Sequence, residues 1–309
     1  MAEKKFIRTV GFYRLVEEQS LEGFPARDWQ RVLGTLHDNK ARVFPINGHE
    51  VDGEVFDYDG ELCLRVSNDR TTAPRQRNTM TRERRPMRVR GVDWEPTEEC
   101  FVRFFEQNIF GMVSTNTSAP SHSAVARWLT RALNYQGSDR LKAVAMVDKT
   151  QYERLRQMGA VSVASVALRP KDAEPGGRGL LEHSWLAARN VGTGVRVEIK
   201  VTVEKGANNQ RERQSLLAES EAILEALQSG QDLGVEKAVV RGKPAGGGPI
   251  EQIDLIEATF TRRTEVELAG TAFDRSLTDR SAIEAVSESY EVLHDKLLAA
   301  IAADLGDRG

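Results

Sequence analysis

Asp172, Glu198 and Lys200 are residue types that a metal-dependent nuclease uses. In such enzymes two carboxylates hold Mg²⁺ and a lysine lies near the scissile phosphate. Glu198 and Lys200 alternate within a strand-like run, so they would share one face of that strand. Asp172, however, falls in a Pro/Gly-rich stretch, and the Glu-x-Lys spacing also occurs at Glu3 and Lys5. The pattern favours a solvated strand face, with a Mg²⁺-dependent nuclease as the alternative.

Other catalytic and metal-binding patterns are missing from the sequence. The five histidines share no metal-ligand spacing with one another, with cysteine or with aspartate. No nucleophile elbow, zinc-protease motif, P-loop or dinucleotide fingerprint occurs. The two cysteines, Cys63 and Cys100, lie far apart, which implies neither a zinc site nor a disulfide framework. We expect a non-enzymatic protein without catalytic residues, cofactor or bound metal.

Residues 70–90, RTTAPRQRNTMTRERRPMRVR, concentrate positive charge in an otherwise acidic chain. They hold eight arginines and one acid, Glu83, whereas the whole chain has a formal net charge of −3. A guanidinium binds phosphate through two parallel hydrogen bonds, and crowded like charges repel one another until a polyanion relieves them. The segment has no aromatic residue to stack on single-stranded bases and no helical periodicity for a recognition helix. It therefore favours backbone contacts to duplex DNA without sequence preference.

The predicted DNA-contact residues include this segment, which we call the arginine segment, and cations elsewhere. An alternative is that the arginines dock an acidic partner protein. The predicted contacts are Arg70, Arg75, Arg77, Arg82, Arg84, Arg85, Arg88 and Arg90 in the segment, Arg127 and Arg131 on a helix, and Lys200 and Lys205 on a strand face.

The elements expected before residue 170 combine strands with amphipathic helices. Three strand-like runs separated by Asn-Gly and Asp-Gly turns predict an antiparallel meander, and the arginine segment that follows predicts a loop or flap. Ser118 or Ser121 is the expected N-cap of a later helix with Val125, Trp128 and Leu129 on its buried face. The predicted elements are strand 6–16, helix 26–36, strands 41–46, 54–59 and 61–66, a hairpin over 100–116, the capped helix, and a strand–helix–strand unit over 141–168.

The elements expected after residue 170 follow a Pro/Gly-rich break. They are a helix near 180–189, a strand at 195–205 with alternating valine, a helix over 211–228, a hairpin within 251–268 and a long helix from 281 to about 305. The apolar seam of that last helix would pack on its own sheet or on a second copy in a dimer. The predicted fold is α+β, with antiparallel-rich sheets in two domains, 1–170 and 180–309.

Composition places the chain among folded cytoplasmic proteins. Its 309 residues are 40% hydrophobic, which suffices for a core. No run approaches the roughly 18 apolar residues of a membrane span, and no signal-peptide core follows the first residues. We therefore expect no direct insertion into a membrane.

The order of these features resembles the RexA family of phage exclusion proteins. A GFY strand at residues 11–13, the meander, the basic segment and a hairpin running into TSAPSHSAVARWL are followed by a helix reading SYEVLHDKLLAAI. The similarity is greatest to family members from temperate phages of high-GC hosts such as mycobacteria. It covers nearly the whole chain through element order and short matches.

This resemblance implies a two-domain homodimer that binds double-stranded DNA without sequence specificity. The fold would be similar to that of RdgC, a ring-forming recombination-associated protein, and domain movement would admit the DNA. The family acts with RexB, a membrane protein, in excluding superinfecting phage and influences the choice between lysis and lysogeny. It offers no catalytic residues. Its basic segment is rich in lysine where this one is rich in arginine, so the resemblance transfers the charge alone.

Overall fold

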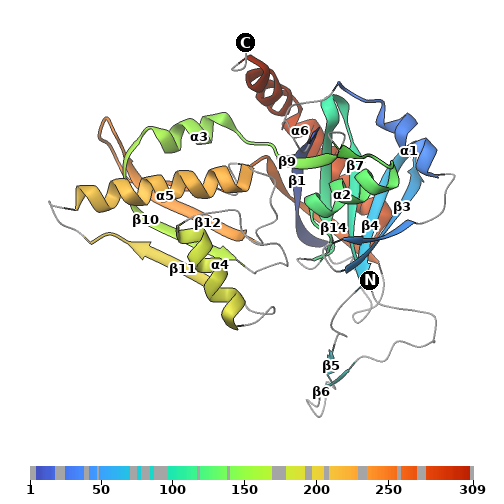
Figure 1. The fold of residues 1–309 in the computed structure, drawn as a ribbon, viewed down its shortest axis with the longest axis horizontal. Coiled ribbons are helices and arrows are strands. Elements are labelled where there is room, and N and C mark those ends of the chain that lie inside the picture. The colour runs from blue at the N-terminus through green and yellow to red at the C-terminus, as the bar shows by residue number, and fades with distance from the viewer. Residues whose placement is uncertain are drawn as a thin grey trace. The chain divides into compact units, whose positions relative to one another are not determined.

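The computed structural model has the predicted α+β fold (Figure 1). It describes residues 5–17, 25–37, 42–46, 49–69, 75–77, 84–86, 97–116, 119–137, 140–168, 179–191, 197–204, 209–228, 235–255, 259–269 and 276–306. In chain order the elements are β1 (Lys5–Glu17), α1 (Trp29–His37), β2 (Arg42–Ile46), β3 (His49–Tyr58), β4 (Glu61–Asp69), β5 (Arg75–Arg77), β6 (Arg84–Pro86), β7 (Thr97–Phe104), the 3₁₀ helix η1 (Glu106–Asn108), β8 (Ile109–Ser114), α2 (His122–Ala132), β9 (Leu141–Ala145), α3 (Lys149–Arg156), β10 (Met158–Leu168), α4 (Leu180–Val191), β11 (Val197–Thr202), α5 (Gln210–Gln228), β12 (Val235–Pro244), β13 (Glu251–Asp254), β14 (Thr261–Ala269), β15 (Ser276–Leu277) and α6 (Asp279–Gly306).

The chain forms two compact units, each made of three separate stretches of the sequence. The first contains Met1–Val10, Arg14–Ala143 and Arg262–Val292, and the second contains Gly11–Tyr13, Val144–Thr261 and Leu293–Gly309. The boundary expected between residues 170 and 180 falls inside the second unit. There β10, which precedes it, pairs with β11 and β12, which follow it.

The first unit is built on a nine-stranded sheet. Its strands are ordered β15-β14-β1-β8-β7-β4-β3-β2, and β9 pairs with β1. The predicted meander is confirmed, because β2, β3 and β4 pair antiparallel with neighbours in sequence. The hairpin predicted over residues 100–116 is confirmed as β7 and β8.

Helices cover both faces of the meander part of this sheet. On one face α1 and α2 pack against β2, β3 and β4. On the other face the Tyr58 hydroxyl donates to Glu284 of α6 at 3.1 Å, and Phe105, which follows β7, stacks on Tyr290 of α6 at 3.7 Å. Side chains alternate between the faces of each strand. Alternate side chains of one strand therefore face α1 and α2 on one side of the sheet and α6 on the other.

The N-terminus of α2 is capped as the sequence predicts. The N-cap is Ser121, whose hydroxyl accepts a hydrogen bond from the Ala124 backbone N–H at 3.3 Å. The other candidate, Ser118, lies outside the described residues. We expect Ser121→Ala to lower the free energy of unfolding by about 1 kcal/mol, because it leaves a helix N–H without its acceptor. Urea unfolding followed by circular dichroism measures this change. Ser118→Ala is the control and should leave stability unchanged; equal losses in both variants would contradict the cap.

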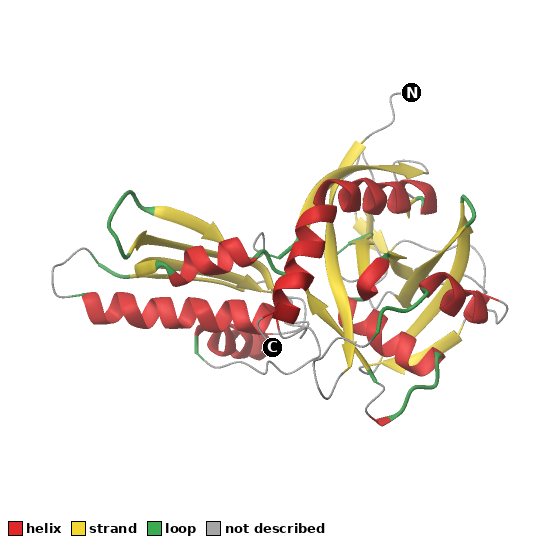
Figure 2. Cartoon of the chain, turned by 90° about the horizontal axis from the view of Figure 1, so that it is seen from above, coloured by secondary structure: helices red, strands yellow, loops and turns green. Residues whose placement is uncertain are grey.

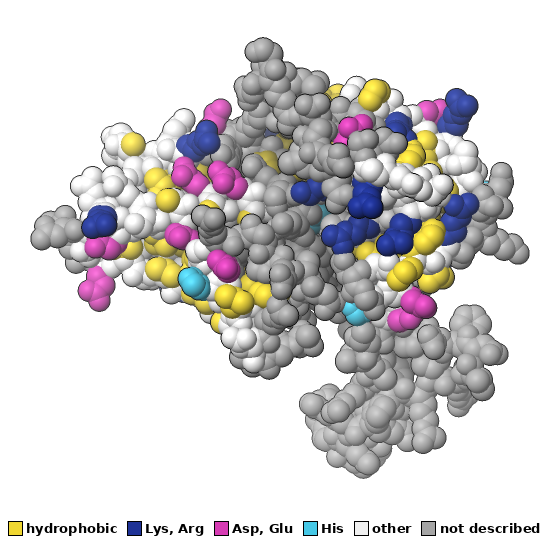
Figure 3. Space-filling model, viewed as in Figure 1, with side chains coloured by type: hydrophobic (Ala, Val, Ile, Leu, Met, Phe, Trp, Pro, Cys, Tyr) yellow, Lys and Arg dark blue, Asp and Glu magenta, His cyan; other side chains and the backbone are white. Residues whose placement is uncertain are grey.

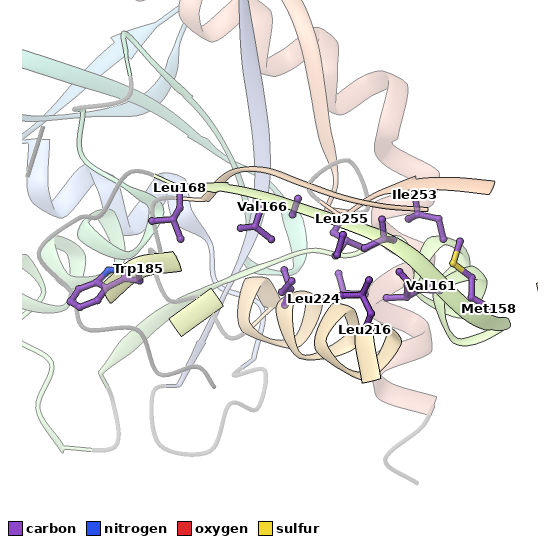
Figure 4. Close-up of a cluster of buried hydrophobic side chains, with 14 residues drawn as sticks. Met158, Val161, Val166, Leu168, Trp185, Leu216, Leu224, Ile253 and Leu255 are labelled. Carbon is purple, nitrogen blue, oxygen red and sulfur yellow. The ribbon is translucent and has the colours of Figure 1, made fainter. Parts of the chain in front are cut away.

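The second unit contains a four-stranded sheet, ordered β11-β10-β12-β13, with α3, α4 and α5 packed on it. Its core joins β10, β12 and β13 to the helices, and Figure 4 shows Val166, Leu224 and Ile253 among the side chains that converge there. Figure 2 shows the two layers, with strands on one side and the long helix α5 beneath. The strand–helix–strand elements over 141–168 are confirmed, although β9 and β10 belong to different sheets.

The hairpin predicted within residues 251–268 is wrong. Both strands exist, but β13 pairs with β12 in the four-stranded sheet and β14 lies between β1 and β15 in the nine-stranded sheet. Strand propensity locates the two runs, whereas their partners are set by distant parts of the chain. The glycine-rich run at residues 245–248 supplies the turn between β12 and β13, with positive φ at Gly247 and Gly248.

The apolar seam of α6 is buried within the chain itself. Ile283, Val286, Leu297 and Ile301 are each no more than 4% exposed. Of the two occupants that the sequence left open for this seam, the chain's own residues are the one observed. Among the described residues, no helix has the length and apolarity needed to cross a membrane.

Candidate nucleic-acid interface

Trp128 fixes α2 on the nine-stranded sheet. Its indole Nε1 donates to the Arg42 carbonyl of β2 at 2.8 Å, and its ring lies directly over Gly53 of β3. At the far side of the helix, the Leu141 N–H of β9 donates to the Thr130 hydroxyl at 3.0 Å. These contacts hold α2 from two sides, so the orientation of its outer face is set by the sheet.

The outer face of α2 carries two arginines. Arg127 and Arg131, both predicted DNA contacts, are exposed and lie one helical turn apart. The helix contains no acidic residue. Like charges at this spacing destabilise a helix by about 0.2–0.5 kcal/mol, a repulsion that a bound anion relieves.

Three further arginines lie at the C-terminal end of α2. Arg42 Nη1 donates to the Ala132 carbonyl at 2.6 Å, which places its guanidinium at the negative end of the helix dipole. The Arg27 guanidinium lies 4.9 Å from the centre of the Tyr135 ring just beyond the helix. Arg140 is exposed and immediately precedes Leu141, whose N–H contacts α2.

We call these five residues the α2 arginine cluster; they are Arg27, Arg42, Arg127, Arg131 and Arg140. Figure 3 shows Lys and Arg side chains gathered over the part of the surface that α2 occupies in Figure 1. The guanidinium of Arg27 lies against a ring and that of Arg42 against a carbonyl, and both of these groups are uncharged. The cluster thus gathers five arginines from several elements of the first unit.

Sequence reasoning identified two members of the cluster and missed three. Arg27 is positioned by its backbone N–H, which donates to Asn108 Oδ1 at 3.1 Å across 81 residues of sequence. Arg42 and Arg140 reach α2 through strand and helix packing. No local pattern marks these three arginines, because long-range contacts bring them together.

The arginine segment contains a short antiparallel ribbon where the sequence predicts a loop or flap. Strands β5 and β6 pair with Arg77 opposite Arg84 and Gln76 opposite Arg85. The segment joins β4 to β7, whose ends meet at the pair Asp69 and Thr97. Among the predicted contacts, Arg70, Arg82, Arg88 and Arg90 lie outside the described residues.

The residues of the nuclease alternative are only partly placed. Glu198 and Lys200 lie on the exposed face of β11, as predicted, whereas Asp172 and the predicted DNA contact Lys205 lie outside the described residues. Glu198 Oε1 accepts hydrogen bonds from Lys237 Nζ at 2.7 Å and from the Ser165 hydroxyl at 3.3 Å. The Glu198 carboxylate is therefore engaged by a cation of its own sheet. Within the described part of the chain, no group of three or more His, Cys, Asp or Glu side chains could hold a metal ion.

Charges on the α6 side of the sheet are arranged differently from the α2 arginine cluster. Arg65 forms ion pairs with Glu54 and with Asp279, the latter at 3.0 Å. Burial raises the pKa of Glu99, while Arg65 opposes that rise. Arg65 on this side is thus matched by two carboxylates.

No protein-family model matches the chain, and no curated protein matches it at a significant level.

Proposed function

We propose that the protein binds double-stranded DNA without sequence preference and does so through its first unit. The α2 arginine cluster carries the proposal, because five arginines converge on one helix that has no acidic residue. The arginine segment belongs to the same unit and supplies further cations. Arginine forks suit phosphate oxygens, and contacts to phosphates carry no sequence information.

The element order supports placing this activity in a temperate phage. The features that resemble the RexA family are present as β1, the meander, the β7–β8 hairpin, α2 and α6. We propose a cytoplasmic, non-enzymatic homodimer with an RdgC-like fold, acting in superinfection exclusion and in the balance between lysis and lysogeny. A membrane protein similar to RexB is the proposed partner.

Fluorescence anisotropy with a random-sequence DNA duplex tests this function over a range of salt concentrations. Each phosphate contact contributes about −0.9 to the slope of log K against log salt. We expect the double variant R127S/R131S to bind more weakly and to have a slope less negative by about 2. The matched control is R263S/R280S, which removes two exposed arginines of the same unit from β14 and α6. It should leave the slope near that of the wild type.

Three outcomes would contradict parts of the proposal. A wild-type protein that fails to bind duplex DNA at physiological salt would point to the alternative of an acidic partner protein. Equal slopes for the two double variants would place the DNA elsewhere than on the α2 arginine cluster. Cleavage of a plasmid in the presence of Mg²⁺, lost in Glu198→Ala, would establish the nuclease alternative.

A further inference from the structure

Strand β11 is an edge strand of the four-stranded sheet. It pairs with β10 on one side, and no described strand pairs with its other side. Figure 1 shows β11 as the outermost strand of that sheet. An edge strand presents a row of backbone N–H and C=O groups, which can pair with a strand of another chain.

The side chains of β11 are incompletely buried on the face that packs toward the helices. Val197, Ile199 and Val201 lie opposite Leu168, Val166 and Ala164 of the core, yet each is only half-buried. The β10 partners are fully buried, with Leu168 and Ala164 at 0% exposure. A further strand beside β11 would complete the burial of this row, which is favourable at about 25 cal/mol per Å².

The sequence of β11 is complementary to itself in antiparallel pairing. If two copies pair with Ile199 opposite Ile199, Val197 meets Val201 and Glu198 meets Lys200, each of them twice by symmetry. A two-fold interface requires this reciprocity, since residue i must contact j while j contacts i. Opposite charges across a strand pair are favourable, and β-branched neighbours pack well.

Both charged residues are placed to make this contact. Glu198 and Lys200 are exposed, and among the described residues no ion pair of Lys200 is found. Glu198 Oε1 accepts hydrogen bonds from Lys237 and Ser165, and the Glu198 side chain is still 38% exposed.

Helix α4 would enlarge the contact beyond a single strand. It packs on β10 and β11, with Trp185 buried. Its next residue, Leu186, is 43% exposed and would add apolar area to the interface where the second copy covers it.

We propose that β11 pairs antiparallel with β11 of a second copy of this chain, with Ile199 at the two-fold axis and Glu198 opposite Lys200 of the other copy. The two four-stranded sheets then form one continuous eight-stranded sheet. The proposal names the interface of the homodimer included in the proposed function. It requires no DNA, so its test can fail while DNA binding succeeds, and the reverse.

Charge reversal tests the pairing by sedimentation velocity without DNA. In E198K, the introduced lysine would face Lys200 of the other copy twice, and in K200E two glutamates would face each other. We expect each single variant to associate at least about tenfold more weakly than the wild type. We expect the double variant E198K/K200E, which restores opposite charges, to recover association.

Mixing provides the decisive control. An equimolar mixture of E198K and K200E allows unlike variants to pair, so we expect heterodimers in the mixture at concentrations at which each variant alone is largely monomeric. In such a heterodimer both contacts between positions 198 and 200 join a lysine of one copy to a glutamate of the other. A folding defect, in contrast, cannot be rescued by mixing. Wild-type protein that is monomeric at all concentrations, single variants that dimerise like the wild type, or a mixture that stays monomeric would each overturn the proposal.

Discussion

Replacing five arginines of the arginine segment by serine is expected to flatten the salt dependence of DNA binding. The variant carries Ser at Arg75, Arg77, Arg82, Arg84 and Arg85. If all five contact phosphates, the slope of log K against log salt should become less negative by about 4 to 5. In the wild type these contacts alone account for a loss of affinity of about 10²–10³-fold between 50 and 200 mM salt. Fluorescence anisotropy on a random-sequence duplex measures both slopes.

A variant with lysine at the same five positions separates the effect of positive charge from that of the planar guanidinium group. Five lysines keep the counterion release, so the slope should stay near that of the wild type. Lysine lacks the planar fork that binds two phosphate oxygens at once, so affinity should still fall. If the serine variant keeps the wild-type slope, the arginine segment does not contact DNA, and the α2 arginine cluster must act without it.

Local sequence signals predicted where each strand and helix lies better than which other elements it pairs or packs with. Alternation at Val197, Ile199 and Val201 identified β11, and spacing at Ile283 and Val286 identified α6, because both patterns lie within one element. The pairing of β13 and β14 with different sheets depends on contacts with strands far away in sequence, which no local pattern encodes.

The sequence likewise predicted the site residues that share one helix and missed those that packing brings to it. Arg127 and Arg131 share a helix face, so their spacing in the sequence places them together. Arg27 and Arg42 join them through Tyr135 and through the Ala132 carbonyl. Such contacts depend on how α1, α2 and β2 pack. Composition marks only the arginine segment, where eight arginines lie within 21 consecutive residues.

Gly53→Ala is expected to destabilise the protein more than its single methyl group suggests. A Cβ atom at Gly53 would come within 3.0 Å of three ring atoms of Trp128, a separation that real Cβ atoms essentially never show. Trp128 is 1% exposed, so its rigid ring has little room to move away. Displacing it would also strain its hydrogen bond to the Arg42 carbonyl. Overpacking and the weakened bond together should lower the free energy of unfolding by about 2–4 kcal/mol, measured by urea unfolding.

Gly34→Ala is the matched control for this substitution. Gly34 lies inside α1, where the nearest atom to an added Cβ is Leu62 Cδ1 at 3.8 Å, an ordinary contact. Alanine is the better helix former, so this variant should gain about 0.5–1 kcal/mol. If Gly53→Ala is as stable as the wild type, Trp128 is not held tightly on β3.

The same substitution connects the packing of Trp128 to DNA binding. Because Trp128 anchors α2, a shift of its ring should move Arg127 and Arg131 relative to Arg42, which belongs to β2. Gly53→Ala should therefore weaken binding to duplex DNA under conditions in which the variant is still folded, whereas Gly34→Ala should not. Unchanged affinity in a destabilised Gly53→Ala protein would show that DNA binding does not require the precise placement of the α2 arginine cluster.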